Sequence, residues 1–404
     1  MKPRIKAVLA AVLLTPLSLW LLAYGWPQQH LYYQNYRFDA AEARRLAPYS
    51  KAMLAYGDQA WRNLAPNQAA GFYRQAVRRD VLNMDGWLKL AQAEAARGRE
   101  EQSRAILSFV AATAGHISRW QSSIALLAHE LGMEDIFRQS INFLLIRKLN
   151  IDTALTLLDV HYGNAEQSLA VLETSNYPLY LDGLIRRGRL ADARLTWNQL
   201  SEHQTPDESM LLKYIDFLIL NKIIDEAQAI WHEYTGTIGV TNGGFEQQPS
   251  GKGFDWRAYP SPDNYWKIRR TMAEGHGHTA GLEIAFFGQA NVDFHHLYQI
   301  VPLMPGRKHR LTFKWRGARL TTDQGPFIEL AGYDCDELYL RSPMLLGSTG
   351  WREMQIDFIA PPDCGAVRLR LRRKISSRFD NQIAGTLWLD DFRIAPLQNP
   401  TGGA

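Results

Sequence analysis

The chain has 404 residues, of which 46% are hydrophobic, and this composition is ordinary for a globular protein of two or three domains. Its formal net charge of +4 is too small for the strong basic stripe of most nucleic-acid-binding proteins, so we expect no nucleic-acid partner. The sequence contains two cysteines and no Gly-x-Ser-x-Gly, HExxH or Walker pattern, so neither a disulfide scaffold nor a catalytic motif is indicated.

The first 30 residues have the pattern of a signal anchor, a membrane helix that is not cleaved. Lys2, Arg4 and Lys6 precede an uncharged run of 18 residues at 7–24, about 27 Å long as a helix, which is close to the thickness of a hydrocarbon core. The basic flank predicts a cytoplasmic N-terminus. We therefore expect residues 1–30 to be a transmembrane helix, with the bulk of the chain extracytoplasmic, on the periplasmic side of a bacterial inner membrane. A cleaved signal peptide is the alternative.

Residues 31–235 form the second predicted domain, a helical region that contains a repeat. Tyr180 and Trp197 recur as Tyr214 and Trp231, and both offsets, 214 − 180 and 231 − 197, are 34 residues. That offset is the length of a tetratricopeptide repeat, and the region resembles this family. The resemblance implies an α-solenoid of helix pairs that docks a protein partner on its curved surface. The four aromatic residues are interpreted as helix-packing residues, with a peptide-binding groove as the alternative.

Residues 236–398 form the third predicted domain, and their pattern is that of a β-sandwich. Short runs alternate apolar and polar residues, as at Val367, Leu369 and Leu371, which alternate with arginines. Gly and Pro turn signals separate these runs at the spacing of a two-sheet sandwich. Residues 399–404 are expected to be a disordered tail. The predicted fold class is therefore multidomain α + β: a transmembrane helix, an α-solenoid and a C-terminal sandwich.

Four short motifs occur in a fixed order within residues 240–396. They are Asn-Gly-x-Phe-Glu at 242–246, Tyr-Gln-x-Val at 298–301, Gly-Trp at 350–351 and Trp-x-Asp-Asp-Phe at 388–392. In this order the motifs resemble the family four and nine carbohydrate-binding modules, which are jelly rolls of the galactose-binding-like group. The resemblance implies a jelly roll that binds a glycan on a concave sheet face or at loop tips.

Candidate glycan contacts follow from what a sugar requires. A pyranose ring packs against flat aromatic side chains, and planar polar side chains bind its hydroxyl groups. Trp256, Tyr259 and Trp266 fall in a loop-like segment and are predicted contacts, although the tryptophans can instead plug one end of the sandwich. Gln299 has the opposite parity to Tyr298. If Tyr298 faces the core, Gln299 faces a groove or solvent, and it matches the glutamine of the family's motif.

Basic residues share one face on each of two predicted strands: Arg368, Arg370 and Arg372 on one, Arg310, Lys314 and Arg316 on the other. If these strands lie in one sheet, the six cations converge. Arg316 and Arg370 are then predicted to bind the carboxylates of an acidic polysaccharide, because a guanidinium recognises a carboxylate as a bidentate fork. The alternative is a solvated face that Glu329, Glu353 and Asp357 neutralise.

The resemblance also implies a structural calcium ion (Ca2+) where the first and last strands meet. Carried over by position, its ligands would be Glu246 with Asp390 or Asp391, completed by backbone carbonyls, because calcium takes six to eight oxygens. The alternative is that these carboxylates cap turns and strand ends. Cys335 and Cys364 are an even pair in a domain expected outside the cytoplasm, which favours a disulfide. Two buried free thiols are the alternative.

These observations together predict a membrane-anchored extracytoplasmic adaptor. It would bind a polysaccharide through the jelly roll and a protein partner through the helical repeats. This pairing of domains resembles that of accessory proteins of bacterial exopolysaccharide assembly or export, so that is the process the resemblance implies. No catalytic residue is assigned. A protein scaffold without sugar binding and a polysaccharide-modifying enzyme are the alternatives.

Overall fold

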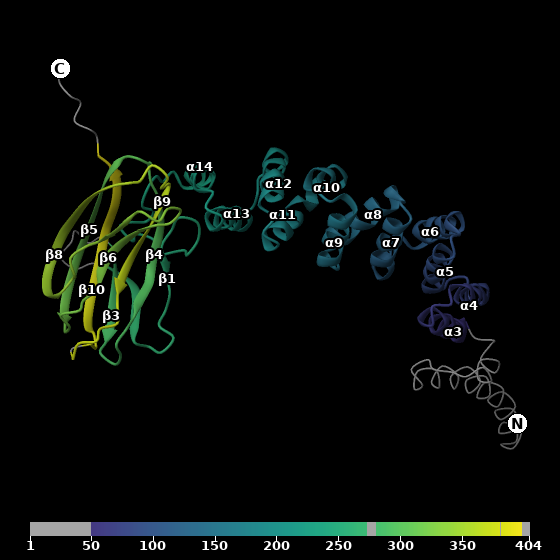
Figure 1. Cartoon of the computed structure of the whole chain (residues 1–404), viewed down its shortest axis with the longest axis horizontal. Helices are drawn as coiled ribbons and strands as arrows, with labels where there is room; N and C mark the ends of the chain where they lie inside the picture. The colour runs from purple at the N-terminus through teal and green to yellow at the C-terminus, as the bar shows by residue number, and fades with distance from the viewer. Residues whose placement is uncertain (1–49, 273–279, 380, 398–404) are drawn as a thin grey trace, which may run out of the picture. The chain divides into compact units, whose positions relative to one another are not determined.

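The computed structural model of the protein describes residues 50–272, 280–379 and 381–397 (Figure 1). The chain divides into two compact units between Thr205 and Pro206. The predicted signal anchor and the predicted tail at 399–404 lie outside the described residues. Within the described ranges, none of the helices combines the length and the apolar character that crossing a bilayer requires.

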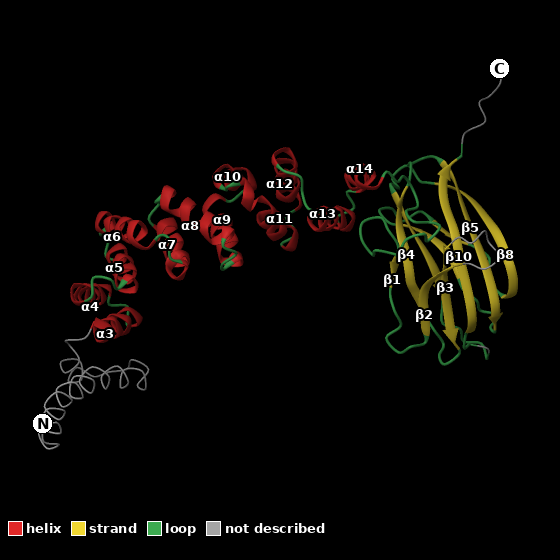
Figure 2. Cartoon of the chain, turned by 180° about the vertical axis from the view of Figure 1, so that it is seen from behind, coloured by secondary structure: helices red, strands yellow, loops and turns green. Residues whose placement is uncertain are grey.

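The first unit is helical within its described residues, and consecutive helices lie side by side as pairs joined by short loops (Figures 1 and 2). Its elements are α3 (Ser50–Arg62), α4 (Pro66–Arg79), α5 (Met84–Ala96), α6 (Glu100–Ala114), α7 (Ser118–Glu130), α8 (Glu134–Ile146), α9 (Ile151–Tyr162), α10 (Ala165–Val171), the 3-10 turn η1 (Thr174–Asn176), α11 (Tyr177–Arg186) and α12 (Leu190–His203). Fully buried alanines such as Ala69, Ala93 and Ala128 lie between neighbouring helices and let their backbones approach closely.

The turns inside these pairs repeat. Leu64, Gly98 and Gly132 follow α3, α5 and α7, and their φ angles of 56°, 73° and 63° are left-handed. Their spacing, 98 − 64 and 132 − 98, is 34 residues in each case. A left-handed residue after a helix terminates it, and glycine adopts that conformation without strain. The period seen in the sequence is therefore also a period of backbone geometry.

The second unit begins with α13 (Glu208–Leu220) and α14 (Ile224–Thr235) and continues into the β domain. The strands are β1 (Arg257–Ala258), β2 (Trp266–Met272), β3 (Ala280–Phe287), β4 (Phe294–Pro302), β5 (Lys308–Leu320), β6 (Phe327–Gly332), β7 (Tyr339–Arg341), β8 (Gly347–Ile359), β9 (Ala366–Arg373) and β10 (Ala384–Pro396). They form two antiparallel sheets of five strands: sheet A, in the order β1-β4-β9-β6-β7, and sheet B, in the order β2-β3-β10-β5-β8 (Figure 2).

The predicted succession of a helical region and a β-sandwich is thus present in the described residues, as a multidomain α + β fold. One apolar core fills the space between the sheets. On β9, Val367, Leu369 and Leu371 are at most 1% exposed and belong to this core, so the alternating arginines point outward from sheet A. Period-two alternation therefore gave the correct facing for this strand.

The last helix pair packs on the β domain. Asp216 of α13 accepts hydrogen bonds from the Gly253 amide and from Arg257, both at 2.9 Å. The Trp231 ring of α14 lies so close to Gly253 that a Cβ there would be 2.2 Å from the indole. These contacts explain why the compact units divide at residue 205. Helical periodicity in the sequence, which ends at α14, predicted a boundary at residue 236 instead.

The four repeat aromatics are buried in both units. Tyr180 and Trp197 are 1% and 7% exposed in the first unit, and Tyr214 and Trp231 are 0% and 5% exposed in the second. Side chains this inaccessible contribute to packing, which favours the helix-packing interpretation over a groove built from these rings.

Candidate functional site

The outer face of sheet A carries a row of long side chains that crosses all five strands. Arg257, Tyr298, Arg370, Glu329 and Arg341 occupy successive paired positions on β1, β4, β9, β6 and β7. Cross-strand neighbours lie about 5 Å apart, so each side chain can contact the next. We call this surface the arginine face.

Most arginines of the arginine face are neutralised by a carboxylate. Arg370 forms an ion pair with Glu329, whose side chain is 2% exposed. Burial raises the pKa of the Glu329 carboxyl, but the Arg370 guanidinium outweighs this effect and holds the pKa below its usual value. Arg372 forms an ion pair with Asp293. The alternative of a face neutralised by Glu329 therefore holds for Arg370, whereas Arg372 is neutralised by Asp293, which the sequence did not indicate.

A groove opens at the side of the sandwich where the edge strands β1 and β2 face each other. It has a volume of about 530 Å³. This edge groove is lined by Gln248, Pro249, Ala258, Pro260, Ser261, Asn264, Trp266, Lys267, Ile268, Arg269, Leu282 and Phe287. The volume is in the range of small-ligand sites, and the lining combines apolar rings with a few polar side chains, as such sites do.

The structure places the three predicted aromatic contacts differently from one another. Trp256 is 1% exposed, and its ring packs 5.2 Å from Phe245 and 5.1 Å from Phe392, so it plugs the core and cannot contact a ligand. Trp266 is 6% exposed and lines the edge groove. Tyr259 is 49% exposed, and its backbone carbonyl accepts the Trp266 indole N–H at 3.4 Å. Trp256 and Tyr259 lie outside regular strands and Trp266 is the first residue of β2, so no alternation in the sequence fixed the facing of these three side chains.

Gln299 is not a glycan contact. Its side chain is fully buried, and its amide bonds both backbone groups of Thr241: Nε2 donates to the carbonyl at 2.7 Å, and Oε1 accepts from the N–H at 3.2 Å. The parity argument held, but Tyr298 faces outward rather than into the core. A buried amide is needed here because the connection at Thr241 brings unpaired backbone groups into the sandwich.

The two basic strands do not converge, and this prediction is wrong. β9 belongs to sheet A and β5 to sheet B, so their outward side chains lie on opposite sides of the sandwich. Arg316 of β5 stacks over the Trp388 ring, with 4.9 Å from Cζ to the ring centroid. Lys314 forms an ion pair with Asp391 at 3.0 Å. Arg316 and Arg370 therefore cannot contribute to one site.

The predicted calcium ligands are only partly brought together. A Cβ on Gly244 would lie 3.7 Å from Oδ1 of Asp390 and 3.9 Å from Oε1 of Glu246, so these two carboxylates flank the same glycine. Asp391 is excluded because Lys314 and Arg393 hold its oxygens at 3.0 and 2.7 Å. Two carboxylates and nearby carbonyls fit a calcium ion in kind, and Asp391 does not belong to the set.

The structure joins Cys335 and Cys364 in a disulfide. Asp334 lies beside it and accepts hydrogen bonds from the backbone N–H groups of Gly365 and Ala366 at 3.1 and 3.0 Å. Among the described residues, Asp334 and the two sulfurs are the one group of three potential metal ligands within 4.8 Å. Disulfide sulfurs are not thiolate ligands, so this group does not indicate a metal site.

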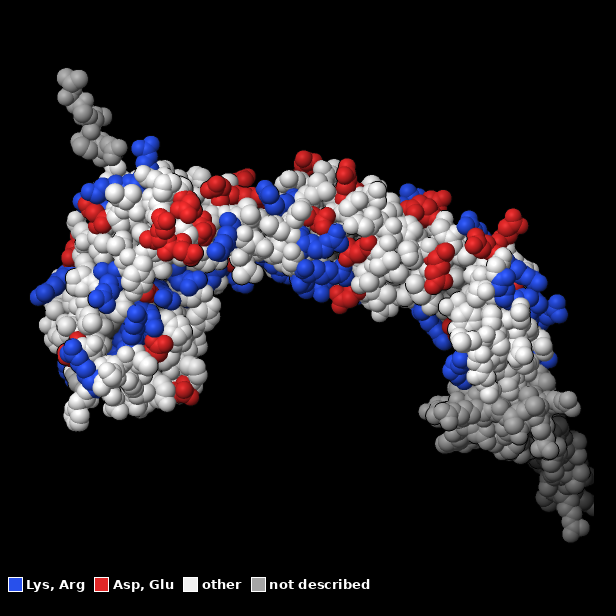
Figure 3. Space-filling view, viewed as in Figure 1, with Lys and Arg blue, Asp and Glu red and all other residues white. Residues whose placement is uncertain are grey.

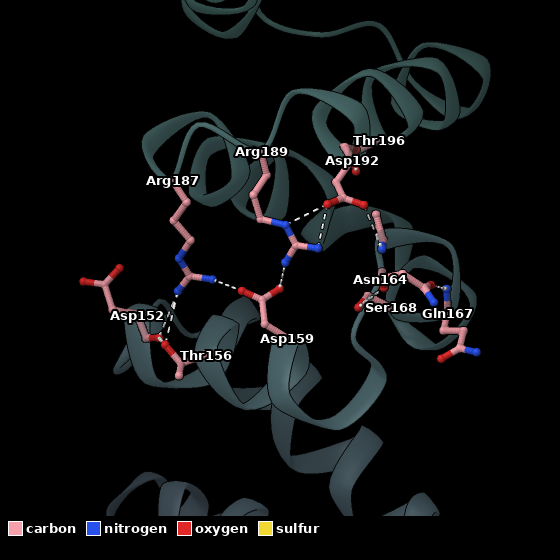
Figure 4. Close-up of polar contacts among 11 residues, drawn as sticks. Asp152, Thr156, Asp159, Asn164, Gln167, Ser168, Arg187, Arg189, Asp192 and Thr196 are labelled. Atoms are coloured by element: carbon pink, nitrogen blue, oxygen red, sulfur yellow. Dashed lines mark hydrogen bonds and ion pairs between the residues drawn. The ribbon is translucent and has the colours of Figure 1, made fainter.

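In the first unit, the basic turn before α12 is neutralised from within the unit. Arg189 donates to Asp159 of α9 at 2.7 Å and to Asp192 at 2.7 Å, and Arg187 also pairs with Asp159 (Figure 4). In the space-filling view, Lys and Arg atoms over α9 and α11 lie beside Asp and Glu atoms (Figure 3). The turn is therefore part of an ion-pair network that joins helix pairs, not an open anion site.

The sequence did not indicate that Tyr298, Tyr333 and Asp216 contribute to the arginine face or support it. Tyr333 follows β6, and its hydroxyl donates to the Ile219 carbonyl of α13 at 3.1 Å. Asp216 lies in a helix that the sequence assigns to the repeats, and nothing local marks it as a partner of Arg257. Only the long-range packing of α13 on the β domain brings these residues together.

Comparisons with known proteins found likeness in fold. No family model and no curated protein matches this chain. Among solved structures, one described as "CBM4 structure and function" is 15% identical over 39% of this chain and 99% of that chain, with a TM-score of 0.28. The module TmCBM61, solved with β-1,4-galactotriose, is 18% identical over 40% of this chain and 100% of its own, with a TM-score of 0.26.

A cyclase from Fischerella sp. TAU is also similar, with 15% identity over 41% of this chain and 100% of that chain and a TM-score of 0.28. One fold hosts different activities, so function has to be argued from the site.

Proposed function

We propose that this chain is a glycan-binding adaptor. The β domain binds a polysaccharide at the edge groove, and the helical repeats dock a protein partner. Residues 7–24 anchor the chain in a membrane with its bulk on the periplasmic side, and the process served is exopolysaccharide assembly or export. The observation that carries the glycan part is the lining of the edge groove.

The edge groove has the two kinds of surface that a sugar needs. Phe287, which is 45% exposed, supplies an open aromatic face, and Trp266, which is 6% exposed, forms part of the buried floor of the groove. Asn264 and Gln248 supply planar amides, and Lys267 adds a cation. Aromatic rings stack on pyranose faces, while amides both donate to and accept from hydroxyl groups.

The lining also separates the glycan proposal from the enzyme alternative. A glycosidase uses two carboxylates on either side of the scissile bond. The described residues that line the edge groove include neither Asp nor Glu. This composition supports binding without hydrolysis.

A hollow in the first unit is a candidate for the protein partner. It lies between α5 and α7, has a volume of about 210 Å³, and is lined by Asp85, Leu88, Lys89, Gln92, Ser123, Leu126, Leu127 and Glu130. Leu126 is 43% exposed there, among charged side chains of both signs. The hollow offers a partner one apolar contact at Leu126 and charged side chains of both signs around it.

The test is binding of the full chain to a panel of neutral and acidic polysaccharides, measured by affinity electrophoresis at two salt concentrations. Phe287→Ala removes an exposed ring from the edge groove and should weaken binding about two- to tenfold. Phe379→Ala is the matched control, because Phe379 is exposed but lies outside the groove lining. Equal effects of both variants, or no retention by any polymer, would favour a protein scaffold.

Variants of Trp256 and Trp266 distinguish a loss of stability from a loss of glycan binding. Trp256→Ala should destabilise the β domain by about 3–5 kcal/mol because it empties a large buried volume, and protein that remains folded should keep its affinity. Trp266→Ala should weaken glycan binding in the fraction that remains folded. Thermal unfolding followed in parallel with binding reports both quantities.

A further inference from the structure

Arg368 lies between two tyrosine rings on the arginine face. Its Cζ is 5.7 Å from the centre of the Tyr298 ring and 5.6 Å from the centre of the Tyr333 ring. Both contacts are within the range of cation–π attraction, which holds a guanidinium at a defined place and orientation.

Unlike its neighbours, Arg368 has no counter-ion among the described residues. Arg257 pairs with Asp216 at 2.9 Å, and Arg370 and Arg372 pair with Glu329 and Asp293. The Nε atom of Arg368 is buried and has no hydrogen-bond partner. The two terminal nitrogens of the guanidinium are not buried in this way, so solvent reaches them. A partly buried guanidinium without an anion is costly, which indicates a position kept for a ligand.

The surroundings fix this guanidinium before any ligand arrives. The Tyr333 hydroxyl donates to the Ile219 carbonyl at 3.1 Å, so α13 holds one of the two rings. The Cζ atom of Arg257 lies 5.9 Å from the centre of the Tyr298 ring, and Arg257 donates a hydrogen bond to Asp216 of α13. Burial raises the pKa of both Tyr298 and Tyr333, so their rings stay neutral at ordinary pH. Such pre-organisation lowers the entropy cost of binding.

A sugar-binding surface continues next to this cation. Tyr259 is 49% exposed, its ring centre lies 6.2 Å from that of Tyr298, and its chain neighbours Ala258 and Pro260 line the edge groove. Trp266, which lines that groove, bonds the Tyr259 carbonyl. A polymer that occupies the edge groove can therefore extend over Tyr259 to the terminal nitrogens of Arg368.

We propose that Arg368, clamped between Tyr298 and Tyr333, is a carboxylate subsite that selects a uronic-acid-containing polysaccharide. The inference rests on the proposed glycan binding and names its substrate class. A guanidinium meets a carboxylate with two parallel N–H···O bonds, which a neutral sugar cannot offer. The Tyr259 ring packs against the adjoining sugar face.

The test compares polygalacturonate with its carboxyl-reduced derivative, which has the same backbone without charge, at one ionic strength and with the full chain. Wild type should bind polygalacturonate more tightly. Arg368→Gln should lower that affinity about 10- to 100-fold and leave the reduced polymer unaffected. Arg310→Gln is the matched control, because it removes the same charge from sheet B on the opposite side. It should leave both affinities unchanged.

Arg368→Lys keeps a charge between the rings without the fork, and an intermediate loss is expected. If thermal unfolding shows that Arg368→Gln does not fold, unchanged affinity of Arg368→Lys overturns the proposal. Equal wild-type affinity for the two polymers overturns the carboxylate subsite but leaves glycan binding standing, whereas no binding of either polymer removes both. Equally tight binding of poly-L-glutamate, lost in the same variant, would make the subsite a docking point for acidic protein instead.

Discussion

The ion pair between Glu329 and Arg370 should contribute strongly to the local stability of sheet A. The Glu329 side chain is 2% exposed and that of Arg370 24%. Arg370→Met would leave the Glu329 carboxylate buried without its cation, and breaking a buried pair in this way costs about 3–5 kcal/mol. We expect the lower end, about 3 kcal/mol, because Tyr339 also helps Arg370 to hold the pKa of Glu329 below its usual value.

The double variant Glu329→Met/Arg370→Met removes both charges. It should be within about 1 kcal/mol of wild type, because the cost of burying each charge disappears together with their attraction. Arg378→Met is the matched control: Arg378 pairs with Asp323 at 2.6 Å, but the two side chains are 65% and 55% exposed. That change should cost less than about 1 kcal/mol.

Hydrogen exchange of the β6 and β9 amides is the suitable assay, because it reports local opening free energies in a chain of two units. The pair also predicts a pH effect. A carboxyl whose folded-state pKa is lowered stabilises the protein above its unfolded pKa, near 4.5, and that contribution is lost as the pH falls through the folded pKa. Arg370→Met should abolish this acid-dependent loss. Equal destabilisation by the single and double variants would refute the reasoning.

Three further predictions concern the disulfide, a buried histidine and calcium. Reduction of the Cys335–Cys364 disulfide, or replacement of both residues by serine, should destabilise the β domain by about 3–4 kcal/mol for a sequence separation of 29, measured by urea unfolding with and without reductant. Burial lowers the pKa of His309, whose Nε2 accepts the Met304 N–H at 3.3 Å. The unfolded chain then binds a proton that the folded chain does not, so Tm should drop as the pH falls below about 6.5, and His309→Phe should flatten that profile. Calcium, if it binds at Glu246 and Asp390, should raise Tm relative to EDTA, and Glu246→Gln should remove the difference; identical wild-type Tm values would contradict the expected calcium site.

Local patterns predicted the facing of regular strands but not the partners of those strands. Val367, Leu369 and Leu371 were assigned to one face, and all three lie in the core, because alternation is a property of the backbone of one strand. The pairing of β9 with β4 and β6, and of β5 with β8 and β10, is decided by contacts far apart in the sequence. Hence the sequence could not show that the arginines of β9 and the cations of β5 lie on opposite sides of the sandwich.

Residues of the candidate site could be predicted only where they lie on strands with regular alternation. Arg370 was expected on an outer face and lies there, while its partner Glu329 was recognised only as a neutralising charge. Trp256 lies in an irregular segment and packs in the core, whereas Trp266 is the first residue of β2 and lines the edge groove. The clamp around Arg368 depends on α13, whose sequence reads as one more repeat helix.

The packing of α13 and α14 on the β domain has a practical consequence for recombinant fragments. A fragment that starts at residue 236, where helical periodicity ends, would lack the Asp216 carboxylate that holds Arg257 and the Ile219 carbonyl that holds Tyr333. It would also expose Phe254, which packs against Trp231. If such a fragment failed to bind, the cause could be the loss of these supporting contacts and not a lack of glycan affinity. A fragment that begins at Pro206 keeps α13 and α14 together with the β domain on which they pack.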